Sequence, residues 1–277
     1  LRGVRSALAQ VKGRAWDRLD DLLGLAAMRL RMGQHPQFPA DLREELDACL
    51  LSFDYVNPRP GQPEEVAAPD ELTESDQITL YAAQIVVGQL YGSAPLPAAG
   101  MTGTRVRDQG EKLADAWLRR HAQVGFALWN SRHEPMISAL ALLADAAAND
   151  ELRDLAAAVL DKLIFGLAVN SFRGAYAAPR AEARASWLRS GSLAPEAPLN
   201  YLLWGIGGLN THLRGAVSLG LAGRNYRPPE LFRAIALDRW PAMLSRERQQ
   251  IGADEYVNTI VFKTPDAMLA SAQDYRA

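Results

Sequence analysis

The chain of 277 residues contains a single cysteine, so no disulfide bond can form within it. Cys49 lies in the apolar segment Asp47-Ala-Cys-Leu-Leu51, a context that predicts a buried thiol rather than a reactive one. The sequence also has no apolar run that approaches the roughly 20 residues of a membrane-spanning helix. We therefore expect neither a disulfide-dependent fold nor a membrane partner.

Neither sign of charge is in excess. The chain has 30 Lys and Arg residues against 32 Asp and Glu residues, which gives a formal net charge of -2. Proteins that bind nucleic acids or anionic membranes usually carry a basic field, and this composition offers none. The charge balance therefore predicts no nucleic-acid partner.

Short motifs with a defined mechanism are missing as well. The sequence has no phosphate-binding loop, dinucleotide fingerprint, HExxH helix, zinc-type cysteine spacing or GxSxG elbow. The four histidines are dispersed along the chain, at His35, His121, His133 and His212. We therefore expect no metal site built from them and no cofactor.

The first residues, Leu1-Arg-Gly-Val-Arg5, have no signal-peptide layout and begin an amphipathic pattern instead. This slightly favours a cytoplasmic location. The chain lacks an initiator Met and stops directly after a strand-like segment, so it is compatible with a piece of a longer protein. Nothing in the sequence indicates an oligomeric state.

What the sequence does contain is the composition of a globular, mostly α-helical protein. Apolar residues make up 48% and charged residues 22%, and a chain of this length can bury a sizeable core. Apolar residues at helical spacing predict one long amphipathic helix from Val4 to Met32. A second helix is expected over Asp41–Leu51, with Pro39 near its first turn.

Thr73 predicts the start of a third helix. With Asp76 three residues later it resembles a capping box, and the helix is expected to run to about Tyr91. A long Pro-rich loop, residues 55–70, comes before it. A fourth helix is expected near residues 104–123, after a Pro- and Gly-rich crossing.

The clearest helix pair lies in the middle of the chain, over Met136–Ala147 and Leu152–Val169. Asp150 is expected to cap the second helix. The connection around Asn149-Asp150 is so short that the two helices are expected to run antiparallel. Beyond them we expect a polar loop over residues 170–192 and a last short helix after Pro228-Pro229.

The end of the chain differs in kind, because β-branched and aromatic residues dominate Glu255–Lys263. Thr264-Pro265-Asp266 is a turn signal, and Met268–Tyr275 can return as a second strand. An isolated hairpin is barely stable in water, so it either packs on the helices or begins a larger sheet. We therefore expect a helical domain over residues 1–253 and a hairpin, the start of a β-domain, over residues 254–277.

Three polar clusters are candidate sites. The densest is Trp129-Asn-Ser-Arg-His-Glu134, which lies just before a helix whose N-terminus carries a partial positive charge. Its amide, guanidinium, imidazole and carboxylate groups could neutralise an acidic sugar and move a proton. The alternative is structural: Ser131 or Asn130 caps the helix, Glu134 interacts with its dipole, and Trp129 packs.

The second cluster, Thr73-Glu-Ser-Asp-Gln77, also opens a helix, and its two carboxylates could serve as acid and base. Helix N-termini collect such residues for capping alone, which is the competing interpretation. The third cluster is Asn170-Ser-Phe-Arg-Gly-Ala-Tyr176 together with Arg180. Its competing interpretation is a helix stop with local hydrogen bonds.

Four segments together resemble a bacterial family of α/α toroids followed by a β-sandwich, similar in architecture to heparinase II/III-type polysaccharide lyases and to toroidal glycoside hydrolases. The resemblance covers roughly Thr73 to Arg276, and the last of the segments is the most specific. These segments are Gln84–Tyr91 with its Gly-Gln-Leu-Tyr ending, Gly125–Ser131, Asn149–Gly174 and Lys263–Arg276. The resemblance implies an α/α toroid of antiparallel helix pairs with a C-terminal β-hairpin.

The chain departs from the pattern of this family at three points. Where the family has the motif S-E-N-H, this chain has Thr73-Glu-Ser-Asp76. The Glu is kept, whereas the Asn and the His are lost. The Glu beside the Trp is replaced by Leu128. A His-Gly-Arg sequence is replaced by Ala178-Pro-Arg-Ala-Glu182, which keeps Arg180 alone. These departures predict that a catalytic function of the family is lost or relocated in this chain.

By analogy with such toroids, the first hypothesis is a carbohydrate-active protein that holds a polysaccharide in a cleft. In a lyase, Asn130 and Arg132 would neutralise the uronate carboxylate, with His133 and Tyr176 as base and acid in either order. In a hydrolase, carboxylates would share those roles, and the candidates are Glu74, Asp76 and Glu134. Further candidates for substrate binding are Trp129, Arg173 and Arg180.

Two alternatives stay open. The chain could be a glycan-binding or assembly protein that kept the toroid and lost the acid/base pair. It could also be a helical scaffold for protein partners, which a large apolar patch on the outer surface would favour.

Overall fold

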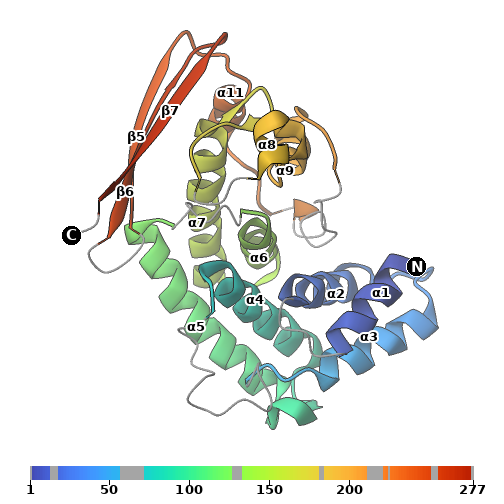
Figure 1. Ribbon diagram of the computed structural model, residues 1–277. Coiled ribbons are helices and arrows are strands. Elements are labelled where there is room, and N and C mark those ends of the chain that lie inside the picture. The colour runs from blue at the N-terminus through green and yellow to red at the C-terminus, as the bar shows by residue number, and fades with distance from the viewer. Residues whose placement is uncertain are drawn as a thin grey trace. The chain divides into compact units, whose positions relative to one another are not determined.

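The computed structural model describes residues 2–12, 18–56, 72–126, 133–180, 184–210, 221–223, 225–250 and 255–275. The protein is mostly helical, with an antiparallel sheet of three strands near its C-terminus (Figure 1). It divides into two compact units. Unit 1 comprises Leu1–Leu118, Ser138–Ala157 and Arg214–Tyr226, and unit 2 comprises Arg119–Ile137, Ala158–Leu213 and Arg227–Ala277.

The N-terminal part of unit 1 is built from short helices that pack on one another. Helix α2 (Leu19–Met32) contacts α1 (Arg2–Lys12) and α3 (Ala40–Ser52). The prediction of one long helix from Val4 to Met32 is therefore wrong, since two parts of that stretch lie against each other. The apolar residues keep the same helical spacing before and after Gly13, so the spacing alone does not separate the two helices. A glycine inside a helix lowers its stability by about 1 kcal/mol relative to Ala.

Helix α4 (Glu74–Tyr91) is the central helix of unit 1, and α2 packs against it. Every residue from Ile78 to Gly88 is buried, as expected for a helix that is apolar on all sides. The buried Gln84 side chain donates to the carbonyl oxygen of Tyr55 at 2.8 Å. Thr73 is the N-cap and accepts a hydrogen bond from the Asp76 backbone N–H at 3.2 Å, which confirms the predicted cap.

A small antiparallel hairpin, β1 (Pro95–Leu96) and β2 (Met101–Thr102), leads from α4 to α5 (Gly103–Val124). A 3-10 turn, Pro97–Ala99, joins its two strands. Helix α5 confirms the helix predicted over residues 104–123, with almost the same bounds.

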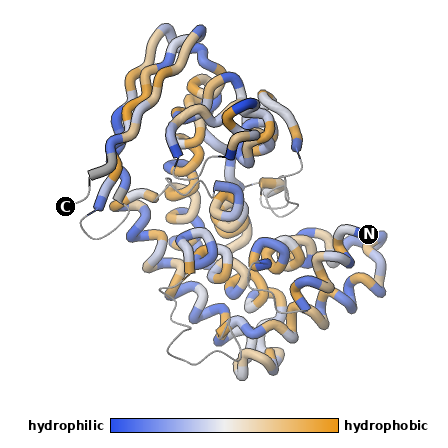
Figure 2. Tube along the Cα trace, viewed as in Figure 1, coloured by the Kyte–Doolittle hydropathy of each residue, from blue (hydrophilic) through white to orange (hydrophobic). Residues whose placement is uncertain are grey.

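The predicted pair of central helices consists of α6 (His133–Ala146) and α7 (Asp150–Val169), both rich in apolar residues. Figure 2 shows apolar residues along much of α7. The side chain of Asn149 accepts from the backbone N–H of Leu152 at 3.2 Å, so Asn149 caps α7 rather than Asp150. The side chain of Asp150 instead accepts from Arg153 at 2.7 Å. Helices α5, α6 and α7 contribute residues to both units.

The expected polar loop after α7 contains a short hairpin of β3 (Ser171–Phe172) and β4 (Ala175–Tyr176). Its two turn residues, Arg173 and Gly174, both have positive φ angles of 49° and 81°, as a two-residue type I′ turn requires. A Cβ at Gly174 would stand 2.5 Å from the backbone nitrogen of Gly207, so only glycine fits there.

Between β4 and the C-terminal sheet, the described residues of unit 2 form three helices and a 3-10 turn. They are α8 (Ala185–Arg189), the turn Gly191–Leu193, α9 (Ala197–Trp204) and α11 (Glu230–Ala236). Helix α9 packs against β4 and α11. Its Asn200 side chain donates to Ser171 Oγ at 3.0 Å and to the Gly174 carbonyl at 3.3 Å, which fixes the β3–β4 hairpin. The short helix predicted after Pro228-Pro229 is confirmed as α11.

The C-terminal sheet has the strand order β5 (Met243–Gln250), β6 (Tyr256–Lys263) and β7 (Met268–Tyr275). The hairpin of β6 and β7 is confirmed with its turn at Pro265-Asp266. The additional strand β5, which pairs with β6 along its whole length, was not predicted. Its sequence, Met-Leu-Ser-Arg-Glu-Arg-Gln-Gln, has few of the residues that favour strands.

Side chains alternate between the two faces of β6. Val257, Val261 and Lys263 are buried, whereas Ile260 and Phe262 are exposed. On the exposed face, Phe262 stands opposite Leu244 of β5 and Leu269 of β7, and all three are solvent-exposed. The sheet thus covers the helices of unit 2 with one face and presents a row of apolar side chains on the other.

A buried lysine attaches this sheet to the helices. The Lys263 ammonium on β6 donates to the carbonyl oxygens of Ser171 at 2.6 Å and Ala168 at 3.2 Å. It also lies 2.8 Å from a carboxylate oxygen of Asp238, just after α11. Because Ala168 is in the last turn of α7, the positive charge also meets the negative end of that helix.

Candidate functional site

The candidate site is a buried group of polar side chains in unit 2, which we call the His133 cluster: His133, Tyr176, Arg180 and Glu196. They lie on or next to three elements of unit 2, namely α6, β4 and α9, of which Figure 1 labels the two helices. His133 is the first residue of α6, Tyr176 ends β4, Arg180 follows four residues later, and Glu196 is the N-cap of α9. The β3–β4 hairpin and the start of α9 therefore determine the geometry of the cluster.

Glu196 is the hub of the cluster. One carboxylate oxygen, Oε2, accepts a hydrogen bond from Arg180 at 2.9 Å, and the other, Oε1, lies 3.4 Å from His133 Nδ1. The side chains are almost completely enclosed, since 1% of Glu196, 1% of His133 and 7% of Arg180 is accessible. A buried carboxylate thus has a permanent cation on one side and an ionisable imidazole on the other.

Tyr176 packs against His133 and Arg180. Its ring centroid lies 5.3 Å from that of His133, and the Arg180 guanidinium lies 4.5 Å from the same Tyr176 ring. Arg180 also donates to the Tyr176 carbonyl oxygen at 3.4 Å. A cation over an aromatic face is attracted by the ring quadrupole, so Tyr176 and Arg180 hold each other in position.

The environment moves the pKa values of the two acids in opposite directions. Burial alone raises the pKa of the Glu196 carboxyl, but His133 and Arg180 outweigh it, so this pKa lies below its ordinary value. Burial raises the pKa of the Tyr176 phenol well above its ordinary value, with the Glu196 charge acting in the same direction. At neutral pH Glu196 is therefore a carboxylate and Tyr176 a protonated phenol.

A further carboxyl group is close enough to act on this cluster. Glu247, on strand β5, contributes to the raised pKa of Tyr176 and interacts electrostatically with His133. Burial raises the pKa of Glu247 itself, although Gln249, Lys162 and His133 oppose the shift. Two carboxyl groups with oppositely shifted pKa values are typical of sites that use one as a charge and the other as a proton carrier.

The hydrogen bonding of the His133 imidazole is incomplete among the described residues. Among the residues that the structure describes, neither imidazole nitrogen has a hydrogen-bond partner with good geometry, and neither has Glu196 Oε1. The Nδ1 to Oε1 distance of 3.4 Å is therefore a close polar contact and not a well-aligned hydrogen bond. Buried polar atoms usually have a hydrogen-bond partner, and the described side chains supply none to the His133 imidazole.

Two further candidate residues of unit 2 are Arg173 and Glu134. Arg173 occupies the β3–β4 turn, where its side chain donates to the Pro265 carbonyl at 3.1 Å and its backbone N–H donates to Asp238 at 3.1 Å. It joins the hairpin to the sheet. Glu134 is buried in the first turn of α6, where a negative charge interacts favourably with the helix dipole.

Glu74 and Asp76 lie in the first turn of α4, in unit 1. Asp76 accepts a hydrogen bond from the Thr73 hydroxyl at 2.6 Å, so it takes part in the helix cap. A cleft shared by Glu74 and Asp76 with the residues before α6 stays a prediction. Trp129, Asn130 and Arg132 lie outside the described residues.

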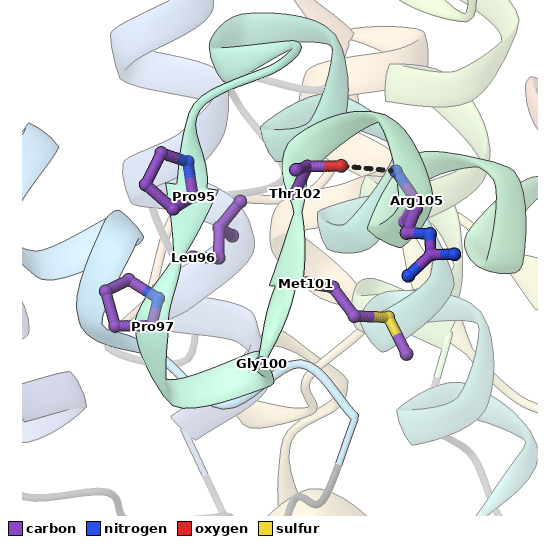
Figure 3. Close-up of a pocket in the computed structure, with 7 residues that line it drawn as sticks. All are labelled: Pro95, Leu96, Pro97, Gly100, Met101, Thr102 and Arg105. Carbon is purple, nitrogen blue, oxygen red and sulfur yellow. Dashed lines mark hydrogen bonds between the residues drawn. The ribbon is translucent and has the colours of Figure 1, made fainter.

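Unit 1 contains an open pocket of about 540 Å³ around the β1–β2 hairpin (Figure 3). Its walls are mainly apolar, and Arg105 of α5 is its charged residue, with the Arg105 backbone N–H 3.5 Å from the Thr102 hydroxyl. Among the described residues, none that was predicted from the sequence to act on a substrate lines it. The lining residues are Pro95, Leu96, Pro97, Gly100, Met101, Thr102 and Arg105.

Within the described ranges, no group of three or more His, Cys, Asp or Glu side chains is arranged to hold a metal ion. No helix in that same part of the chain is both long and apolar enough to cross a membrane. Cys49 is buried, as predicted, and burial raises the pKa of its thiol.

Two of the acidic residues described above, Glu196 and Glu247, were not among the candidates predicted from the sequence. Glu196 stands in Ala194-Pro-Glu-Ala-Pro198, where the second Pro signals a helix start and therefore an N-cap at Glu196. That signal is present in the sequence, but nothing there links it to His133. Glu247 was missed together with its strand.

No known protein-family model matches the chain, and neither a curated protein nor a solved structure shows significant similarity to it. The case for a function therefore rests on these side chains themselves.

Proposed function

We propose that the chain is a carbohydrate-active protein that acts on an acidic polysaccharide, with the His133 cluster as its acid/base site. The observation that supports this proposal most is the convergence of three candidate residues. His133 comes from one segment of the sequence and Tyr176 and Arg180 from another, and the three side chains lie together around one carboxylate, Glu196.

The pKa shifts divide the chemical roles in this proposal. Tyr176 is a protonated phenol at neutral pH, and in this proposal it is the proton donor. His133 is the base, and the Glu196 carboxylate beside Nδ1 stabilises the imidazolium that forms when the base takes a proton. His133 and Arg180 together lower the pKa of Glu196, and Arg180 is its hydrogen-bond donor.

These roles fit β-elimination from a uronate better than glycoside hydrolysis. His133 would remove the proton at C5, and the electron pair would form the C4–C5 double bond as the bond to the glycosidic oxygen breaks. Tyr176 would donate its proton to that leaving oxygen. Hydrolysis would instead need two carboxyl groups across the bond, and of the candidates for that pair, Asp76 already serves in a helix cap.

The proposal includes the finer architecture, in which the helix pairs belong to an α/α toroid and their loops surround a glycan-binding cleft. This step rests on analogy between folds. It is supported by the mostly helical composition and by the helices α6 and α7, which are separated by only residues 147–149.

A second candidate function is a glycan-binding protein without catalysis. The observation that favours it is burial: 1% of His133 and 8% of Tyr176 is accessible, and Arg180 already pairs with Glu196. In that case the cluster would stabilise the fold beneath a binding surface, and no bond of the polysaccharide would be broken.

The two candidates are separated by incubating the protein with pectate, alginate, heparan sulfate and hyaluronan, with neutral xylan and amylose as controls. The lyase predicts ultraviolet absorbance from unsaturated uronate ends, in step with new reducing ends. The non-catalytic candidate predicts binding of at least one polymer in calorimetry with neither signal. New reducing ends without ultraviolet absorbance would indicate hydrolysis and contradict the roles given to His133 and Tyr176. No binding and no product on any polymer would reject the proposed function altogether.

A further inference from the structure

The pocket at the β1–β2 hairpin of unit 1 combines apolar walls with one cation. Its volume of about 540 Å³ lies within the range of small-molecule sites in proteins. Among the described residues that line it, only Thr102 and Arg105 have polar side chains, and none is acidic. Figure 3 shows the rings of Pro95 and Pro97 on one side of the hairpin and the side chains of Met101 and Arg105 on the other. The pocket therefore offers a ligand apolar contact and a positive charge.

Proline chemistry and packing make the apolar wall rigid. The rings of Pro95 and Pro97 lock the backbone φ angles of both residues, and both residues are exposed. Leu96 between them is completely buried, and β1 and the 3-10 turn after it pack against α3. A rigid wall loses little conformational entropy when a ligand binds to it. The apolar part of a ligand therefore meets a surface that is already formed.

The Arg105 guanidinium is available to a ligand. Arg105 is exposed in the first turn of α5, and within the described ranges its side chain has no ion pair or hydrogen bond. The next arginine along the helix, Arg107, pairs instead with Asp108 at 2.8 Å and with Glu111 at 3.8 Å. The two acidic residues that follow Arg105 most closely in the sequence are therefore already paired with another cation.

These features fit an amphipathic anion with a single charge. A guanidinium forms charge-assisted, two-point hydrogen bonds with a carboxylate. A sugar is a poor fit, because most of its hydroxyl groups would lose water against apolar walls without gaining a partner. An added peptide strand is also a poor fit, since the prolines at positions 95 and 97 have no N–H to pair with it.

We infer that this pocket binds a medium-chain aliphatic monocarboxylate, with the hydrocarbon chain on the two prolines and Met101 and the carboxylate on Arg105. The site is independent of the proposed function, because its residues belong to unit 1 and the His133 cluster belongs to unit 2. Two separate physical effects recognise the ligand, the burial of methylene groups and the pairing of one charge.

The test is calorimetric titration of the full chain with octanoate, butanoate and octanol. Each methylene group that leaves water completely improves affinity about fourfold. Because the pocket is open, the additional methylene groups of octanoate are expected to lower its dissociation constant about ten- to hundredfold relative to butanoate. Octanol should bind more weakly than octanoate, since it has no charge for Arg105.

Arg105→Gln is expected to raise the dissociation constant for octanoate about tenfold, whereas octanol should bind to this variant as to the parent. The difference should shrink at high salt, which screens exposed charges. Met101→Gln places a polar group in the wall and should weaken octanoate and octanol equally.

The matched control is Lys112→Gln, which removes a positive charge from an exposed position farther along α5. It should bind octanoate like the parent. Thermal unfolding of each variant identifies a loss that comes from misfolding. If Met101→Gln is misfolded, Arg105→Gln, altered at an exposed position, decides the test.

A parent that does not bind octanoate would overturn the inference. Equal affinities of Arg105→Gln and Lys112→Gln for octanoate would place the ligand elsewhere and overturn it as well. Equal affinities of the parent for butanoate and octanoate would reduce the site to a surface arginine that attracts any anion. A tetrapeptide with a free C-terminal leucine that binds more tightly than octanoate, and also depends on Arg105, would assign the pocket to a peptide terminus instead.

Discussion

Replacing Lys263 by methionine is expected to lower the free energy of unfolding by about 3–5 kcal/mol, because it leaves a buried carboxylate without its cation. Only 8% of the Asp238 side chain is accessible, and Lys263 lies 2.8 Å from it. The carbonyl oxygens of Ser171 and Ala168 would lose a donor as well. Equilibrium unfolding in urea, followed by circular dichroism, measures the loss.

The double variant Lys263→Met with Asp238→Asn should recover part of that loss, since it removes the unpaired charge as well. Asn tolerates the positive φ of 55° at position 238. Lys112→Met, at an exposed position of α5, is the control and should change stability by no more than about 0.5 kcal/mol. If Lys263→Met lowers the free energy of unfolding no more than Lys112→Met does, Lys263 does not attach the sheet to the helices.

Replacing Arg180 by methionine is expected to cost a similar amount, about 3–5 kcal/mol near neutral pH, because Glu196 then keeps its charge in a buried site without the guanidinium. The substitution removes the 2.9 Å hydrogen bond that Arg180 donates to Glu196. Arg189→Met, on the exposed α8, is the control. The double variant Arg180→Met with Glu196→Gln should be more stable than Arg180→Met alone, and urea unfolding of all four proteins measures the difference.

The pH dependence gives this prediction a definite sign. The pKa of Glu196 is lowered in the folded protein, so its ionisation stabilises the fold above the unfolded pKa of about 4.3. That contribution is lost as the pH falls through the folded pKa. Stability of the parent should therefore fall more steeply than that of Glu196→Gln below about pH 4.3. Parallel curves for the two proteins would contradict a lowered pKa.

The helices could be predicted where capping and periodicity agree. α4 begins at its Thr73 cap, and the strands β6 and β7 have the predicted bounds because β-branched residues alternate around a clear turn. Where the local signal is weak, prediction failed. β5 is a polar strand that exists because β6 pairs with it, and this tertiary pairing is invisible in its own composition.

The candidate site could be predicted only in part. His133, Tyr176 and Arg180 were found because polar residues that bracket helices are recognisable, but their convergence on Glu196 depends on how α6, β4 and α9 pack. Capping residues give the same local pattern without a site, as Thr73 and Asp76 illustrate. Polar residues at a helix start therefore indicate candidates, and tertiary packing decides among them.

The most direct test of the central claim is the rate at which Tyr176→Phe releases unsaturated uronate ends from the polymer that the parent cleaves. The substitution removes the proton donor but keeps the ring that packs on His133 and Arg180. Turnover is expected to fall about a hundredfold or more, with unchanged binding and unchanged thermal unfolding, while Tyr201→Phe on the exposed side of α9 behaves like the parent. Equal turnover by Tyr176→Phe and the parent, or a parent that binds the polymer and never cleaves it, would contradict the claim that this cluster is an acid/base site.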